Sequence, residues 1–327
     1  MNLLRVDVGK RETTMQAIPP QYEGLGGRGL GAKILLEEVD PTCHALGHKN
    51  KIIFAIGLWP TSRLSSSGRL SVVSKSPLTG TIKEANAGGT VGQKLGRLGI
   101  RAIIVEGAPQ DNHSYLLKIS KGVAQLEVAD DLKMKGNYAL AKELIGRYGD
   151  KASIIAIGPA GENGLFVSSV VCTDADGDPS RVAARGGLGA VMASKGLKAI
   201  VVVDDGDHSI KIHDEKAFRE ATKLYHQALL ANPLLGKIMP TMGTPGSLMI
   251  LNDVGGLPTR NFREGSFEHA EAISGPSLQK LVHSRGGAGR FGMTCMPGCV
   301  IRCTHAFADA QGNEVVRALE YETLGMM

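Results

Sequence analysis

Three cysteines near the end of the chain have the spacing of metal ligands. Cys295, Cys299 and Cys303 stand four residues apart in the segment GMTCMPGCVIRCTHAF. A period of four would place them on one helical face, but Pro297 and Gly298 disfavour a helix interior, so we predict a loop around a metal. Thiolates select zinc or an iron–sulfur cluster, and no C-x-x-C or H-x-x-x-H pair supports a zinc finger. The trio therefore predicts an iron–sulfur cluster, with zinc or no metal as the alternatives.

The other candidate ligands near the trio are few. His305 follows closely and is either a fourth ligand or an ordinary surface histidine. Cys43 and Cys172 lie far away in the sequence and are expected to be ordinary buried or surface thiols. Because the chain is expected in a reducing compartment, five cysteines do not predict a disulfide framework.

Two glycine-rich segments have the composition of anion-binding turns. They are KEANAGGTVG (83–92) and SRVAARGGLGAVM (180–192). Paired glycines before a short helix let backbone N–H groups approach an anion closely. Arg69, Arg181 and Arg185 add guanidinium groups suited to phosphate. The alternative is a pair of structural turns with solvated arginines.

A third glycine-rich segment, GLGGRG (24–29), matches the G-x-G-x-x-G pattern of dinucleotide sites. That pattern needs a hydrophobic strand before it, whereas AIPPQYE precedes it here and its two prolines oppose a central strand. We therefore predict a glycine turn before a helix over 30–40 rather than a nucleotide site.

The elements that must position these turns belong to an internal repeat. Residues 88–107 align with 185–205 at an offset of 97, and IIFAIG aligns with SIIAIG at an offset of 101. Each unit is predicted to run from strand through polar loop and glycine turn to a short helix and a second strand. Two such units about a pseudo-twofold axis would present similar loops to one ligand. Chance similarity of glycine turns is the alternative. The predicted strands cover residues 51–57, 69–76, 101–107, 114–120, 152–158, 165–172 and 198–205.

The pattern of the sequence changes from β-rich to helical after Asp207. Residues 213–233 carry apolar side chains at helical spacing, with Asp214 as the predicted N-cap and Pro233 as the end. Most of the remainder is expected to be helix and loop. We therefore predict a β-rich domain over 1–208 and a second domain over 209–327.

Composition limits the function classes. The net charge is +5, with basic residues scattered among acids, so nucleic-acid binding is not favoured. No apolar run suits a signal peptide or a membrane span, which predicts a soluble cytoplasmic protein.

Several motifs together resemble those of the tungsten-containing aldehyde ferredoxin oxidoreductases. The resemblance covers essentially the whole chain but only about the N-terminal half of such an enzyme, so we expect a fragment or one half of a split enzyme. The motifs, in order, are GRLSVVSKSPLTG (68–80), EANAGGTVGQKLGRLGIRAIIVEG (84–107), IAIGPAGENG (155–164), RVAARGGLGAVMASKGLKAI (181–200), TRNFREG (259–265), CMPGC (295–299) and EYETLG (320–325).

The resemblance implies an α+β fold and a cofactor. The first domain would be a pseudo-twofold, two-sheet base that carries two molybdopterin ligands of one tungsten or molybdenum, followed by the start of a mainly helical domain. A Mg²⁺ ion would bridge the pterin phosphates through backbone carbonyls, with Val182 at one carbonyl position. Arg69 would lie between pterin and cluster. The implied cofactor-binding residues are Arg69, Asn86, Ala87, Gly88, Arg181, Val182, Ala183, Ala184 and Arg185.

The resemblance also implies a [4Fe-4S] cluster with three cysteines from this region and a fourth from later in the sequence, beyond residue 327. Cys295 and Cys299 match two family ligands, whereas Gly292 stands where the family has its first cysteine. We expect Cys303 to replace that ligand.

The implied reaction converts an aldehyde and water to a carboxylic acid, with electrons passing through the cluster to ferredoxin or a similar carrier. Glu322 matches a glutamate that exchanges protons beside the metal, and Tyr321 is next to it. A buried carboxylate of raised pKa would suit that role. A homodimer is a further expectation. The alternatives are a catalytically inactive cofactor-binding fragment and a small iron–sulfur electron-transfer protein.

Overall fold

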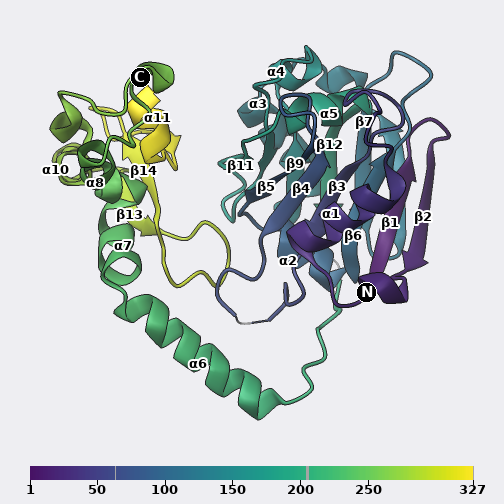
Figure 1. Ribbon diagram of the computed structural model, residues 1–327, viewed down its shortest axis with the longest axis horizontal. Helices are drawn as coiled ribbons and strands as arrows, with labels where there is room; N and C mark the ends of the chain where they lie inside the picture. The colour runs from purple at the N-terminus through teal and green to yellow at the C-terminus, as the bar shows by residue number, and fades with distance from the viewer. Residues whose placement is uncertain (63, 204–205, 327) are drawn as a thin grey trace. The chain divides into compact units, whose positions relative to one another are not determined.

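The computed structural model describes residues 1–62, 64–203 and 206–326. They form two compact units, Met1–Lys211 and Ile212–Met327, whereas the predicted boundary followed residue 208. Each unit is described by itself, and Figure 1 shows their elements. Within the described residues, every helix is too short or too polar to cross a membrane.

The first unit contains two mixed sheets, each with six strands among the described residues. The first sheet has the order β2-β1-β6-β3-β4-β5 and the second has the order β8-β7-β12-β9-β10-β11. The strands are β1 (Asn2–Asp7), β2 (Glu12–Ala17), β3 (Ile52–Ile56), β4 (Leu70–Lys75), β5 (Ile82–Ala87), β6 (Ile100–Glu106), β7 (Tyr115–Ser120), β8 (Val123–Val128), β9 (Ala152–Ala156), β10 (Val170–Cys172), β11 (Arg181–Ala183) and β12 (Leu197–Val203).

Helices and short turns connect these strands. They are η1 (Pro20–Tyr22), α1 (Gly27–Glu38), α2 (Val91–Arg97), η2 (Asp130–Leu132), α3 (Asn137–Tyr148), α4 (Pro159–Glu162) and α5 (Leu188–Ser194). The predicted helix over 30–40 is α1, which begins at Gly27 inside the GLGGRG segment.

The predicted duplication is confirmed by the order of the elements. The order β1-β2-η1-α1-β3-β4-β5-α2-β6 is followed by β7-β8-η2-α3-β9-β10-β11-α5-β12, with α4 as an addition in the second half. The pairing register agrees with the predicted offsets, because Ala55 pairs with Ala102 while Ala156 pairs with Ala199. The two sheets therefore have the same topology, and equivalent turns occupy equivalent places in them.

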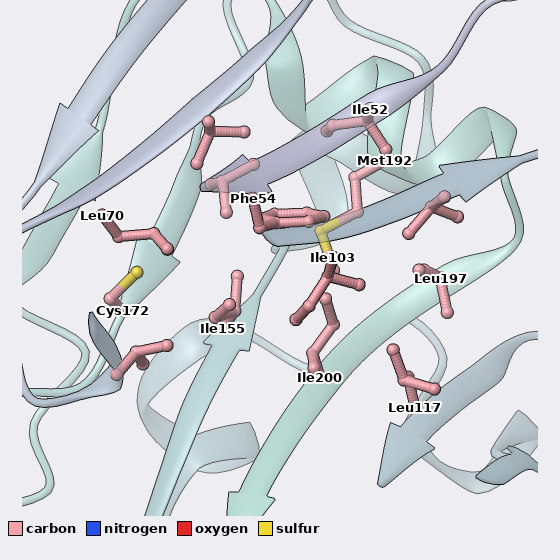
Figure 2. Packing of buried hydrophobic residues seen from close by; sticks show 14 of the residues in the cluster. Ile52, Phe54, Leu70, Ile103, Leu117, Ile155, Cys172, Met192, Leu197 and Ile200 are labelled. Atoms are coloured by element: carbon pink, nitrogen blue, oxygen red, sulfur yellow. The ribbon is translucent and has the colours of Figure 1, made fainter. Parts of the chain in front are cut away.

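The core of the first unit lies between its two sheets. Figure 2 shows Phe54 and Ile103 of the first sheet together with Ile155 and Ile200 of the second and Met192 of α5. Each such buried side chain stabilises the fold by roughly 1.5–3 kcal/mol relative to exposure. Because α1 covers the outer face of the first sheet and α3 that of the second, the central strands are buried on both faces. This explains their continuous apolar runs.

Five strands of the first unit were not predicted. They are β1, β2, β5, β8 and β11. Of these, β5 and β11 were expected to be loops, and this expectation was wrong. Both are sheet edges, where polar side chains are tolerated and the apolar signal of a central strand is missing. The predicted strand over 165–172 was too long, because only Val170–Cys172 is a strand.

The second unit is mainly helical, as predicted, but it also contains a small unpredicted antiparallel sheet of order β13-β14-β15. The Asp214 carboxylate caps α6 by accepting a hydrogen bond of 2.9 Å from the Ala217 N–H, which confirms the predicted N-cap. The elements are α6 (Glu215–Ala231), η3 (Leu234–Ile238), α7 (Met239–Met242), η4 (Thr244–Ser247), α8 (Leu248–Asp253), α9 (Thr259–Phe262), η5 (Ala270–Ile273), α10 (Gly275–Arg285), β13 (Arg290–Met293), β14 (Thr304–Ala308), β15 (Glu314–Arg317) and α11 (Tyr321–Met326).

Candidate functional site

The two glycine-rich segments meet in the first unit. Strands β5 and β11, the edges of the two sheets, lie side by side (Figure 1). The Ser76 hydroxyl donates a hydrogen bond of 2.7 Å to the Gly186 carbonyl. The Lys83 side chain lies so close that a β-carbon added at Gly186 would be 2.4 Å from Lys83 Cγ. Segments about a hundred residues apart in sequence are thus in direct contact.

The turns after β5 and β11 have equivalent backbones. Gly89 has φ +95° and Gly186 has φ +90°, a conformation that side chains disfavour. Three residues later, the backbone approaches a neighbouring carbonyl in both halves. A β-carbon at Gly92 would lie 2.1 Å from Gly68 O, and one at Gly189 would lie 2.6 Å from Ser169 O. The predicted pair of matching glycine turns is therefore present.

The first turn is lined by a hydrogen-bonded arginine and asparagine. Arg69 directly precedes β4, Asn86 and Ala87 end β5, and Gly88 follows. Arg69 Nε donates to Asn86 Oδ1, and Arg69 Nη2 lies 3.5 Å from the Asn86 carbonyl oxygen. Asn86 Nδ2 donates in turn to Ser71 Oγ at 3.2 Å. The arginine and asparagine predicted for this site are therefore direct partners.

The second turn is built around a buried arginine. Arg181 begins β11, is 6% exposed, and places Nη2 3.9 Å from Asp174 Oδ2. Asp174 also accepts hydrogen bonds from the Asp176 and Asp178 N–H groups and, at 2.6 Å, from Ser180 Oγ. A buried charge needs such partners. The Asp174 carboxylate therefore supplies a counter-charge to the buried guanidinium group, at a distance longer than a hydrogen bond.

The remaining predicted residues of the second turn differ in exposure. Ala183 is buried, whereas the side chains of Val182, Ala184 and Arg185 are exposed. Alternation along β11 buries Ala183 and exposes Val182, since successive side chains point to opposite faces of a strand. Ala184 and Arg185 follow the strand and are both exposed. The Arg185 guanidinium group is therefore available beside the Gly186 turn.

These residues fit a two-armed anionic ligand such as a bis-pterin cofactor. Arginines flank both turns and suit anionic groups, whereas the turn glycines are buried and packed against protein atoms, Gly89 near Thr173 O and Gly186 near Lys83 Cγ.

The cysteine trio lies where the sequence indicated but does not form a ligand set. The three thiols occupy the loop between β13 and β14, which confirms the predicted absence of a helix. Cys299 is 7% exposed, and Cys295 and Cys303 are half-buried. Among the described residues, no three His, Cys, Asp or Glu side chains converge as metal ligands. All five cysteines lie in the described part of the chain, and none forms a disulfide.

The thiol of Cys172 and the imidazole of His305 are both fully buried. Cys172 is fully buried, and burial raises the pKa of its thiol to about 12, so it is neutral. His305 is also fully buried, and its Nε2 lies 2.7 Å from the Leu319 carbonyl oxygen. The interpretation of His305 as a surface histidine was therefore wrong.

The expected catalytic pair begins α11 in the second unit. Both Tyr321 and Glu322 are half-buried. The Tyr321 N–H donates a hydrogen bond of 3.2 Å to Thr244 Oγ1, and its side chain packs against the buried cluster of Leu248, Leu257 and Ala270. The carboxylate at position 322 is less buried than we expected.

Sequence reasoning missed two charged residues beside the first turn. Glu84 Oε1 accepts hydrogen bonds from Ser71 Oγ at 2.8 Å and Asn86 Nδ2 at 3.3 Å. Glu84 Oε2 lies 3.1 Å from Nη2 of Arg28. No sequence signal pairs Arg28 with Glu84, because they are far apart in the chain and meet only through the fold.

Known proteins share both units of the chain. Residues 3–204 match the family described as "Aldehyde ferredoxin oxidoreductase, N-terminal domain", and residues 220–327 match "Aldehyde ferredoxin oxidoreductase, domains 2 & 3". The tungsten-containing aldehyde ferredoxin oxidoreductase of Pyrococcus abyssi is 39% identical over 272 residues, which are 82% of this chain and 43% of that protein. The enzyme of the same name from Thermococcus kodakarensis is 36% identical over 84% of this chain and 44% of its own length.

A solved structure and a more distant relative agree with these matches. The active-site complex BamBC of benzoyl-coenzyme A reductase, solved with 1,5-dienoyl-CoA, matches with a TM-score of 0.74 and 25% identity, covering 94% of this chain and 47% of that one. The WOR-like subunit of an aliphatic sulfonate oxidoreductase from Pyrococcus furiosus is 25% identical over 83% of this chain and 43% of its own. The chain thus spans less than half the length of each curated relative named here. By sequence and by fold, it belongs to the aldehyde ferredoxin oxidoreductase family.

Proposed function

We propose that the protein to which this chain belongs oxidises aldehydes to carboxylic acids with a tungsten or molybdenum bis-pterin cofactor. Two named relatives are tungsten-containing aldehyde ferredoxin oxidoreductases. The observation that carries the proposal is the pair of matching glycine turns that meet at β5 and β11. A ligand with two equivalent anionic arms requires two equivalent binding surfaces.

The residues of the first unit would bind the two arms of the cofactor. Arg69, Asn86, Ala87 and Gly88 would hold one arm, and the segment Arg181 to Arg185 would hold the other. Guanidinium groups neutralise and orient phosphates. The Asn86 and Val182 carbonyls would bind a Mg²⁺ ion between the phosphates, since oxygen ligands suit that ion.

The proposed reaction converts an aldehyde and one water to a carboxylic acid, two electrons and two protons. When bound, the cofactor supplies a metal that can accept the two electrons. Glu322 would take up one proton at its carboxylate, and the packing of Tyr321 fixes the first turn of α11 that carries it. The electrons would leave to ferredoxin or a similar carrier.

We also propose that Cys295, Cys299 and Cys303 are ligands of an iron–sulfur cluster. The support is their thiol chemistry, their common loop and the family resemblance. The loop would have to draw the three thiols together around the cluster. Serine substitution of Cys299 should therefore lower the iron content, whereas serine at the distant Cys43 should leave it unchanged.

The test is metal and pterin analysis of the full-length protein purified without oxygen. We expect tungsten or molybdenum with pterin, about four irons, and turnover with aldehydes. Full-length protein free of both tungsten and molybdenum would overturn the proposal. The 327-residue chain alone should show no turnover, and measurable activity from it would show that these residues suffice.

A further inference from the structure

We propose that Glu84 is a positioning residue of the first ligand-binding turn, and that the GLGGRG segment serves to hold it. This inference rests on the proposed function, because the group that Glu84 positions is Asn86, a proposed cofactor-binding residue. It assigns a role to a motif that the nucleotide interpretation left unexplained.

Glu84 fixes the orientation of the Asn86 amide. The two residues lie on the same face of β5, and Ser71 of β4 pairs with Asn86 in the register. The amide nitrogen donates to Glu84 Oε1 at 3.3 Å and to Ser71 Oγ at 3.2 Å. The amide oxygen accepts from Arg69 Nε. Both ends of the amide are thus specified, so the side chain cannot flip without losing hydrogen bonds at each end.

The useful property of Glu84 is its acceptor oxygen rather than its charge. Its side chain is 10% exposed, so the loss of the acceptor would leave Ser71 Oγ and the Asn86 amide poorly satisfied. The partner Arg28 donates from Nε at 3.2 Å and Nη2 at 3.1 Å, but its side chain is 76% exposed. An ion pair with so exposed a member adds little stability. Arg28 instead orients the carboxylate.

Gly27 of GLGGRG and Gly31, two residues beyond the motif, bring α1 close to β4. A β-carbon at Gly27, where φ is +50°, would lie 3.3 Å from Ser71 Oγ. A little further along, a β-carbon at Gly31 would lie 2.5 Å from Val73 Cγ2. The start of α1 is therefore pressed against β4, next to the residues that hold Asn86, and Arg28 reaches Glu84 from there.

The second half of the repeat lacks this arrangement. In the pairing register, Ala55 and its counterpart Ala156 lie opposite Ser71 and Val171, and these lie opposite Asn86 and Val182. Val182 therefore stands in the place of Asn86, and Ser180 stands in the place of Glu84. The Glu84 network is thus no general requirement of the duplicated fold, since the equivalent strand is built without it. It is a feature of the first turn alone.

The test compares Glu84→Ala with Glu84→Gln in the full-length protein. Glutamine keeps the Oε1 acceptor and loses the charge, whereas alanine loses both. We expect the rate of tungsten or molybdenum loss to rise about tenfold in Glu84→Ala, since one buried hydrogen-bonding group is removed, and to stay within about twofold in Glu84→Gln. Asp207→Asn removes the exposed pair with Lys121 and should change nothing.

Thermal unfolding of the metal-free variants separates positioning from general stability. If Glu84 had a merely structural role, its substitution would lower the unfolding temperature in proportion to the increase in the rate of metal loss. If Glu84 is a positioning residue, its substitution changes the rate of metal loss more than it changes the unfolding temperature. If Glu84→Ala does not fold, Ser71→Ala removes only a hydroxyl and should accelerate metal loss in the same direction. Wild-type retention in Glu84→Ala, or equal losses in both Glu84 variants, would overturn the inference. Wild-type protein without either metal would overturn the proposed function instead.

Discussion

The close backbone approach at Gly92 predicts that one methyl group there will destabilise the first unit. Gly92 is the second residue of α2, and a β-carbon there would lie 2.1 Å from Gly68 O and 2.9 Å from Gly68 C. Both atoms belong to the backbone, so no side-chain rotation can relieve the overlap. Either α2 or the segment before β4 must move, and each belongs to the packed core.

The magnitude follows from two opposing effects. Overpacking of a core costs about 3 kcal/mol when the neighbour cannot yield. Alanine gains about 1 kcal/mol over glycine in a helix interior. The net loss in Gly92→Ala is therefore about 2 kcal/mol, which corresponds to a fall in melting temperature of roughly 4–8 °C for a unit of this size. Gly146→Ala in α3 is the matched control, because nothing lies within 4 Å of its β-carbon.

The assay is thermal and urea unfolding of the full chain, followed by circular dichroism and by the fluorescence of Trp59. This is the only tryptophan, and it lies in the first unit, so its signal reports unfolding of that unit. Gly146→Ala should be more stable than wild type by up to about 1 kcal/mol. If Gly92→Ala were as stable as Gly146→Ala, the close approach of the turn to Gly68 would be wrong.

Two further predictions concern buried charges. Burial lowers the pKa of the Lys195 ammonium to about 8, against about 10.4 when unfolded. Between these values the unfolded chain binds more protons, so Lys195 makes stability rise with pH over that window. Urea unfolding of Lys195→Met between pH 7.5 and 10.5 should lack that rise, and an unchanged slope would contradict it. Asp174→Ala should cost about 3–5 kcal/mol, because the buried Arg181 loses its carboxylate, whereas Asp174→Asn should cost less, and equal unfolding midpoints for the two would refute this.

The repeat could be predicted from sequence because its signal lies in glycines. Glycines at turns with positive φ or close backbone contact cannot be replaced without strain, so they mark equivalent places in both halves. The edge strands β5 and β11 could not be predicted, because their polar side chains make contacts with residues that are distant in sequence and close only in the fold. Glu84 is suited to its strand only because Ser71 and Arg28 face it there, and neither is near it in sequence.

The candidate site was also predictable only in part. Motif resemblance indicated Arg69, Asn86 and Arg181. The structure places Arg69 just before β4, Asn86 near the end of β5 and Arg181 at the start of β11, on the strands next to the two glycine turns. The motif resemblance could not indicate the residues that contact Arg181 and Asn86, namely Asp174 and Glu84, since these contacts depend on the conformation of a loop and on helix packing. A sequence motif records which groups face a ligand more readily than which groups support them.

The duplicated fold does not make a symmetrical site. The two turns share their backbone conformation, yet the strands before them carry different charged groups, the acid Glu84 in β5 and the buried Arg181 in β11. Glu84 is held by an arginine from a helix, whereas Arg181 is held by Asp174 from a loop. A ligand with two identical arms would therefore meet an acid-supported asparagine on one side and a buried guanidinium group on the other. This difference between the side chains beside the two turns would let the turns contact the two arms through different groups. Duplication alone would not have produced the difference.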